Sequence, residues 1–228
     1  MDPESDPHVT PGGSHVIKHA DFGKRSPTLG FTESAANLIQ QRETVYHAMF
    51  GDSESVFHEL VPFVPHIDIY VHKPGYDGRD FYTLASGGMS DLRMTLPEEA
   101  DETWWHRVEL IFYTHEAKKE YLEMLRVLAH FPHDYKTCLG WGHTIPWGPL
   151  FSGSSFTAVL FVSSIVSPDS KLGERLIVNA DPVNFLWVVP LTAPELEYKL
   201  QKGTDALLEL FDEVHHPFIF DENRESYV

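Results

Sequence analysis

Fourteen histidines among 228 residues are the feature of this sequence that most directly suggests chemistry, because imidazole binds metal ions and transfers protons near neutral pH. A His-Glu-x-x-His zinc site needs two histidines on one helix face with a glutamate between them. The close pairs lack that glutamate, and Pro132 breaks the helix that would align His130 with His133. We therefore expect no metal site and no cofactor. The pairs are His15/His19, His130/His133 and His215/His216.

Ser90 follows a glycine pair and is the candidate nucleophile. The run Gly88-Met89-Ser90-Asp91-Leu92 begins like a nucleophile elbow, but Leu92 stands where a second glycine must allow the sharp turn. These glycines also lack the spacing and the lysine of a phosphate-binding loop. We therefore expect no catalytic residue here. Cys138 is the one cysteine, so an intrachain disulfide and a thiolate zinc cluster are excluded, which suits a reducing compartment.

The charge is strongly negative, with 34 acidic and 17 basic residues and a net charge of −17. Nucleic acids and anionic membrane surfaces need a cationic face, so we expect neither as a partner. The charge could steer a basic protein toward this one, or it could serve solubility alone. Abundant carboxylates leave a catalytic pair open, but nothing in the sequence selects one.

Two segments are unusual in composition. Ser86–Asp91 carries adjacent glycines after a strand, which permit positive φ or a close backbone approach. Leu139–Trp147 places two glycines around Trp141 and puts Trp147 after a proline. Tryptophan is enriched at the centres of protein interfaces, but composition alone favours tryptophans that plug the core.

Hydrophobic periodicity predicts the elements that must position these segments. Alternation over 66–72, 81–85 and 105–113 predicts half-buried strands, whereas 156–162 and 184–189 are apolar on both faces and predict central strands. Helical spacing covers 33–50 and 116–130, with Thr114 as the N-cap of the second helix and Phe131-Pro132 as its end. Thr192 and Glu195 form a capping box before a helix to 202, and Gly203 separates it from a helix over 205–214. A short strand is expected within 175–178. The sequence predicts one α/β domain of the α+β type, a mixed sheet packed against helices.

The expected organisation is a flexible N-terminal arm (1–30), a folded domain (31–216) and a C-terminal tail (217–228), of which Phe220–Val228 are polar and expected to fray. The acidic start has no apolar stretch behind it, so it cannot be a secretory signal. The longest apolar runs are far shorter than the ~20 residues of a membrane helix. We therefore expect a cytoplasmic protein.

Several blocks of this chain are similar to a known family. It resembles the Suppressor of fused domain in its bacterial single-domain form, over about residues 35–215. The order and spacing of separate blocks make the resemblance specific, although Gly87-Gly88 stands where relatives commonly have one glycine. The blocks are Phe81–Leu84, Ser86–Asp91 running to Met94, Leu128–His133, Leu139–Pro146, Pro190–Leu191, Glu195–Leu200 and Gly203–Phe211.

The resemblance implies a compact α/β domain without known catalytic activity. Animal relatives restrain a Hedgehog-pathway transcription factor by clamping a short peptide between this domain and a second, C-terminal one. This chain ends near the close of the first domain, so we expect half of that clamp to be missing. Bacterial relatives often look like immunity proteins, which neutralise toxins. The leading hypothesis is a non-catalytic protein-binding module, an inhibitor of the immunity type or a regulator, whose partner is a basic toxin domain or a short peptide segment.

The family motifs select the residues that either bind the partner or lock two loops together. The candidates are Gly88, Met89, Ser90, Asp91, Gly140, Trp141, Gly142, His143 and Trp147. The alternative is a metal- or carboxylate-dependent hydrolase that uses Asp91 and His143, which requires these side chains to converge in a pocket. A third possibility is a structural partner in a larger assembly, which large exposed apolar patches would indicate.

Overall fold

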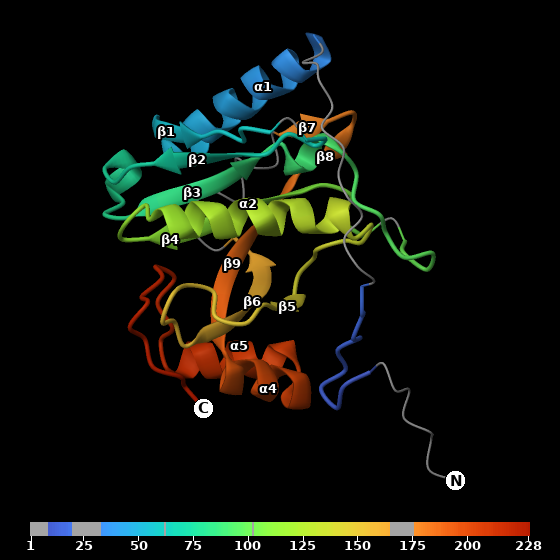
Figure 1. The fold of residues 1–228 in the computed structure, drawn as a ribbon, viewed down its shortest axis with the longest axis vertical. Helices are drawn as coiled ribbons and strands as arrows, with labels where there is room; N and C mark the ends of the chain where they lie inside the picture. The colour runs from blue at the N-terminus through green and yellow to red at the C-terminus, as the bar shows by residue number, and fades with distance from the viewer. Residues whose placement is uncertain (1–8, 20–32, 62, 102, 165–175) are drawn as a thin grey trace.

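A seven-stranded mixed sheet lies at the centre of the computed structural model, with helices on both of its faces (Figure 1). The structure describes residues 9–19, 33–61, 63–101, 103–164 and 176–228. The strand order is β1-β2-β3-β4-β9-β6-β5; β4 and β9 run parallel and the other neighbours antiparallel. The predicted α/β class is confirmed. The strands are β1 (Ser53–Phe57), β2 (Asp68–His72), β3 (Tyr82–Gly87), β4 (Val108–Thr114), β5 (Thr144–Pro146), β6 (Phe156–Ser163) and β9 (Asn184–Thr192).

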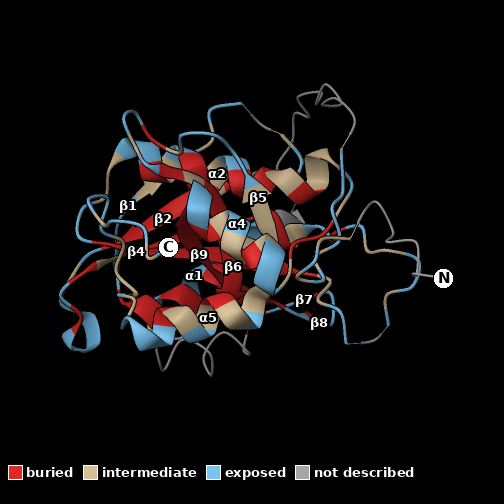
Figure 2. Cartoon of the chain, turned by 90° about the horizontal axis from the view of Figure 1, so that it is seen from below, coloured by how far each residue is buried: buried red, intermediate tan, exposed pale blue. Residues whose placement is uncertain are grey.

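Alternate residues of each strand enter two separate cores. Ile111 and Tyr113 of β4 pack in the core that contains residues of α1 and α5, whereas Leu110 and Phe112 pack in the core formed with α2. This is the two-residue period of a sheet covered on both sides. Figure 2 shows the buried sheet behind the partly exposed helices α4 and α5. The helices are α1 (Glu33–Phe50), α2 (Lys119–Asp134), α4 (Ala193–Lys202) and α5 (Thr204–Glu213).

The two long apolar strands lie inside the sheet as predicted. β6 and β9 pair along most of their length and are buried on both faces. The sequence analysis missed both edge strands, β1 and β5. β1 is polar and mostly exposed, and β5 has three residues, so neither carries an alternating pattern.

Helix ends were predicted with mixed success. The capping box is confirmed, since Thr192 N donates to Glu195 Oε2 (2.9 Å) and Glu195 N donates to Thr192 Oγ1 (3.4 Å). The N-cap assigned to Thr114 is wrong, because α2 begins at Lys119 and Thr114 ends β4. Helix α2 also continues through Pro132 to Asp134, since a proline in the last turn removes only one backbone hydrogen bond.

The C-terminal residues pack on the domain, so the prediction of a frayed end is wrong. Phe220 N donates to Tyr113 O (2.9 Å), and its ring contacts Phe112, Tyr121, Phe151 and Phe156. Arg224 donates to both carboxylate oxygens of buried Glu195, at 2.5 and 2.8 Å. Aromatic burial and a buried ion pair therefore hold this segment against β4, β6 and α4.

Part of the expected arm also contacts the domain. Gly12 N donates to Leu200 O in α4 (2.8 Å), and the His19 ring contacts Phe131 and Tyr135 at the end of α2. Residues 9–19 therefore run from a helix on one face of the sheet to a helix on the other. Residues 1–8 and 20–30 of the expected arm lie outside the described residues, as does Arg175. The short strand expected near it is β7 (Ile177–Val178), which pairs with β8 (Asp181–Pro182) in a separate hairpin.

Candidate functional site

The first motif segment forms a tight turn after β3. Gly88 has φ of 112°, and a Cβ at this position would collide with the carbonyl oxygen of His66. Only glycine fits both requirements. A short 3₁₀ turn follows at Met89–Asp91. The chain therefore folds back over the start of β4 at this point.

A buried carboxylate at the start of β4 organises this turn. Glu109 is fully buried and accepts hydrogen bonds from Ser86 Oγ (2.5 Å), Gly88 N (3.0 Å), Ser90 N (3.0 Å) and Ser90 Oγ (2.6 Å). Burial raises the pKa of Glu109, while the nearby Arg42 guanidinium and the serine hydroxyls oppose that rise. The sequence analysis did not select Glu109. Its one signal was an acidic residue inside an otherwise apolar strand.

The rest of the turn is also bound within the chain. Asp91 forms an ion pair with buried Arg42 of α1. Arg107 Nη1 donates to Ser90 O (2.7 Å), and His133 Nε2 lies 2.9 Å from Met89 O. Each of these contacts ties the turn to α1, α2 or β4. The turn residues Gly88, Met89, Ser90 and Asp91 thus hold α1, α2 and the start of β4 together.

The second motif segment lies elsewhere and is exposed. Gly142 turns with φ of 78° and leads into β5, the edge strand. Trp141 and Trp147 stand before and after β5 and are 46% and 38% exposed. The expectation from composition that they plug the core is wrong. Here the glycines make a bend, and the two indoles lie at the surface at both ends of an edge strand.

A pocket of about 310 Å³ opens beside this segment. Its lining includes the indole of Trp104, which is 37% exposed, and the partly buried imidazole of His143. Burial lowers the pKa of His143, so the ring is neutral at pH 7. The lining residues are Thr103, Trp104, Trp105, Cys138, Leu139, Gly140, Trp141 and His143.

The free edge of β5 lies between the two exposed tryptophans. Phe161 N donates to His143 O (2.9 Å), and hydrogen-bonded pairs alternate along an antiparallel ladder. The amide and carbonyl of Thr144 therefore point away from β6. Among the described residues, β6 is the one strand that pairs with β5. The amide and carbonyl of Thr144 are thus placed to hydrogen-bond one residue of an extended segment, whereas Pro146, the next outward position, has no amide to donate.

The structure does not bring Asp91 and His143 together. Within the described ranges, no hydrogen bond or ion pair joins them, and Asp91 is absent from the pocket that His143 lines. The described residues contain no group of three or more His, Cys, Asp or Glu side chains that could hold a metal ion. The arrangement therefore gives no support to a hydrolase that uses this pair.

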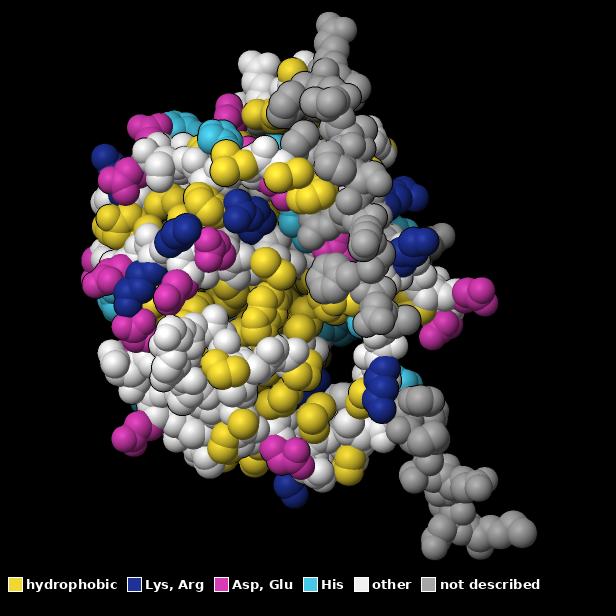
Figure 3. Space-filling view, in the orientation of Figure 1, with side chains coloured by type: hydrophobic (Ala, Val, Ile, Leu, Met, Phe, Trp, Pro, Cys, Tyr) yellow, Lys and Arg dark blue, Asp and Glu magenta, His cyan; other side chains and the backbone are white. Residues whose placement is uncertain are grey.

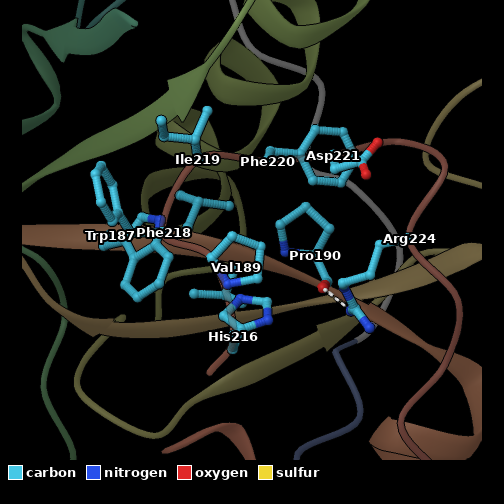
Figure 4. Close-up of a pocket in the computed structure, with 11 residues that line it drawn as sticks. Trp187, Val189, Pro190, His216, Phe218, Ile219, Phe220, Asp221 and Arg224 are labelled. Atoms are coloured by element: carbon cyan, nitrogen blue, oxygen red, sulfur yellow. Dashed lines mark hydrogen bonds between the residues drawn. The ribbon is translucent and has the colours of Figure 1, made fainter. Parts of the chain in front are cut away.

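A second cavity lies under the C-terminal segment, between β9 and residues 216–224 (Figure 4). Its volume of about 10 Å³ admits roughly one water molecule. Figure 4 shows Arg224 bonded to Pro190 O across it. This cavity is too small for a ligand and is a packing gap beneath the docked tail.

Comparison with known proteins places this fold. A sequence model described as Suppressor of fused protein (SUFU) matches residues 64–225. The chain belongs to the Suppressor of fused family. Both motif segments fall within the matched region, as do the glutamate that holds the first and the edge strand that follows the second. No curated protein sequence matches the chain.

Three solved structures of the family share the fold. A SUFU homologue from Neisseria gonorrhoeae FA 1090 has a TM-score of 0.62 and 20% identity, covering 85% of this chain and 98% of its own. The crystal structure of the Sufu–Fu complex has a TM-score of 0.56 and 16% sequence identity. The match covers 84% of this chain and 91% of that one. Drosophila Suppressor of Fused gives 0.53 and 17%, covering 83% of this chain and 50% of its own. This chain thus matches half of the Drosophila protein.

No helix among the described residues is long and apolar enough to cross a membrane.

Proposed function

We propose that this chain is a non-catalytic binding module that sequesters a partner protein in the cytoplasm, as a regulator or an immunity-type inhibitor. The observation that carries the proposal is the β5 edge with an exposed tryptophan at each end. Exposed tryptophan side chains are costly to hydrate. Tryptophan is also enriched among the interface residues that contribute most of the binding free energy. An extended partner segment pairs with Thr144 on β5, and its side chains pack on Trp141 and Trp147.

The similarity to the Sufu–Fu complex supports a protein partner, because that relative was solved bound to another protein. The net charge of −17 supports a basic one, such as a cationic toxin domain. Opposite charge speeds encounter and orients the partner, while the aromatic surface holds it after contact. In this account the motif turn at Gly88–Asp91 keeps the domain rigid and does not contact the partner.

The test is affinity capture from the source cells with the full chain as bait, washed at low and high salt. A stoichiometric basic partner that high salt releases is the expected result. The variant Thr144→Pro removes the outward amide without touching the β5–β6 bonds, and it should lose that partner. The variant Val127→Ala changes an exposed apolar residue on α2 and should retain it. A partner that Thr144→Pro still captures in full contradicts strand addition at β5.

A further inference from the structure

Lys199 is a buried lysine that takes no part in the contacts described above. It lies in the last turn of α4 and is 3% exposed. Its Nζ donates to Ser14 Oγ of the arm at 2.9 Å. Among the described residues, no carboxylate lies within ion-pair distance of this ammonium. That is unusual in a chain with 34 acidic side chains.

Three segments converge around Lys199. The arm touches the junction of α4 and α5, where Gly12 N donates to Leu200 O. The same junction touches the second motif segment, since Thr204 Oγ1 donates to Gly142 O at 3.5 Å. His143 follows Gly142 and lies near enough to Lys199 that the ammonium, after burial, helps to lower the imidazole pKa. Lys199 therefore lies between the arm and the turn that leads into β5.

A buried ammonium without a counter-ion is expensive. Removing one such charge from water costs several kcal/mol even after the protein relaxes. The hydroxyl of Ser14 is neutral, and the C-terminus of α4 contributes at most about half a negative charge. His143 is neutral and offers no negative charge. Burial lowers the pKa of Lys199 accordingly. Within the described ranges, this site is therefore short of one negative charge.

We propose that Lys199 is the recognition group of a carboxylate-binding subsite at the β5 edge, where Ser14 Oγ holds the place of a ligand oxygen. Figure 3 shows a hollow on this side, between the arm and the body of the domain. A carboxylate fits better than a phosphate, because one ammonium matches one negative charge and the surrounding field is negative. The proposal rests on the proposed function only in taking the carboxylate to belong to a partner chain.

Two sources can supply this group: the C-terminal carboxylate of a chain or an Asp or Glu side chain. The two probes that separate them are N-acetylglycine and the N-methylamide of N-acetylaspartate. Each is titrated into full-length protein in which lysine carries ¹³C and ¹⁵N, and the Lys199 signals are followed by NMR. The variant Lys199→Met assigns those signals, since it fills the same space without a charge. It also removes the buried charge, so it should fold.

We expect at least one probe to shift the Lys199 signals in a saturable way and to raise its pKa by about one unit, a tenfold preference for the charged form. Stronger binding of N-acetylglycine indicates a chain terminus, stronger binding of the aspartate amide indicates a side chain, and equal binding indicates recognition of the carboxylate alone. Ser14→Ala should tighten binding several-fold, because the competing hydroxyl is gone. Lys202→Met, an exposed neighbour on α4, should leave binding unchanged.

Lys199 signals that neither probe moves at 50 mM, in wild type and in Ser14→Ala, would overturn the subsite. So would equal binding of the probes to wild type and to Lys199→Met, measured by isothermal titration calorimetry. These readouts need no partner protein, so a failed subsite is distinct from a failed proposed function.

Discussion

The carboxylate of Glu109 accepts hydrogen bonds from both the backbone amide (3.0 Å) and the hydroxyl (2.6 Å) of Ser90. Ser90 thus anchors the turn after β3, and its hydroxyl is buried against a carboxylate. The same carboxylate lies 3.8 Å from Arg42 Nε, and Arg42 in turn holds Asp91. The first family motif therefore ties the turn to α1 and β4, whereas the surface that we propose for binding is the exposed second motif.

Replacing Glu109 tests this role of the first motif. The Glu109→Gln side chain keeps the volume, but its NH2 group faces the hydrogen-bond donors that the carboxylate accepted. Buried Arg42 also loses that negative charge. Breaking one side of a buried charge network costs about 3–5 kcal/mol, and we expect that loss in the free energy of unfolding measured with urea. Glu99→Gln, at an exposed position, is the control and should be neutral. A loss below about 1 kcal/mol for Glu109→Gln contradicts that role.

Substitutions at Gly88 and Gly75 form a matched test and control for the close approach in the turn. Their φ angles are 112° and 118°, but a Cβ at Gly75 meets nothing within 4 Å, whereas one at Gly88 meets the His66 carbonyl. Gly75→Ala should cost about 1–2 kcal/mol of stability from backbone strain alone. Gly88→Ala should cost clearly more, because the backbone must also move. Similar thermal midpoints for the two variants contradict the close approach at Gly88.

The contacts of Arg224 in the C-terminal segment indicate what its loss should cost. Its guanidinium lies over the rings of Phe156 and Tyr227 and neutralises buried Glu195. Arg224→Met keeps much of the apolar contact but leaves Glu195 without a counter-ion. We expect a loss of about 3–5 kcal/mol in unfolding free energy and faster protease cleavage after residue 214. Lys118→Met, which breaks an exposed ion pair with Glu222, serves as the control. Equal stability in both variants indicates that the tail is not held by this pair.

Two buried histidines predict how stability depends on pH. Burial lowers the pKa of His72 and of His216 to about 4, from an ordinary value of 6.5. The unfolded chain therefore binds more protons than the folded one between these values, so stability is full above pH 6.5 and falls on acidification toward pH 4. By pH 4 the loss is about 3 kcal/mol per histidine.

His216→Phe keeps the stack on Phe211 and should flatten part of that slope, whereas the exposed His115→Phe should not. Urea unfolding at several pH values measures both. An unchanged slope in His216→Phe means that His216 does not titrate in this range.

The sequence predicted the interior of this fold better than its boundaries. Apolar strands such as Phe156–Ser163 and the box of Thr192 with Glu195 depend on local patterns, so they could be read directly. The edge strand at Thr144–Pro146 depends on pairing with β6, which no local pattern encodes. The tail was missed because Phe218 and Phe220 are partly buried against residues that are distant in the chain.

The candidate residues lie in two separate parts of the fold, which the sequence alone could not predict. Asp91 and His143 belong to different parts of the molecule, and their separation follows from the strand order. The hydrogen-bond partners of the Gly88–Asp91 turn come from α1, α2 and β4, which lie far apart in the chain. The exposure of Trp141 likewise depends on the edge position of β5.

The β5 edge and its two tryptophans are the surface that we propose binds a partner protein. The most direct measurement is the affinity of the captured partner for wild type and for the double variant Trp141→Ala/Trp147→Ala, by isothermal titration calorimetry. We predict binding at least about thirty-fold weaker, the 2 kcal/mol typical of an interface hot spot, with an unchanged thermal midpoint because both side chains are exposed. Unchanged affinity, or a weaker affinity that merely follows a lower thermal midpoint, would contradict the account.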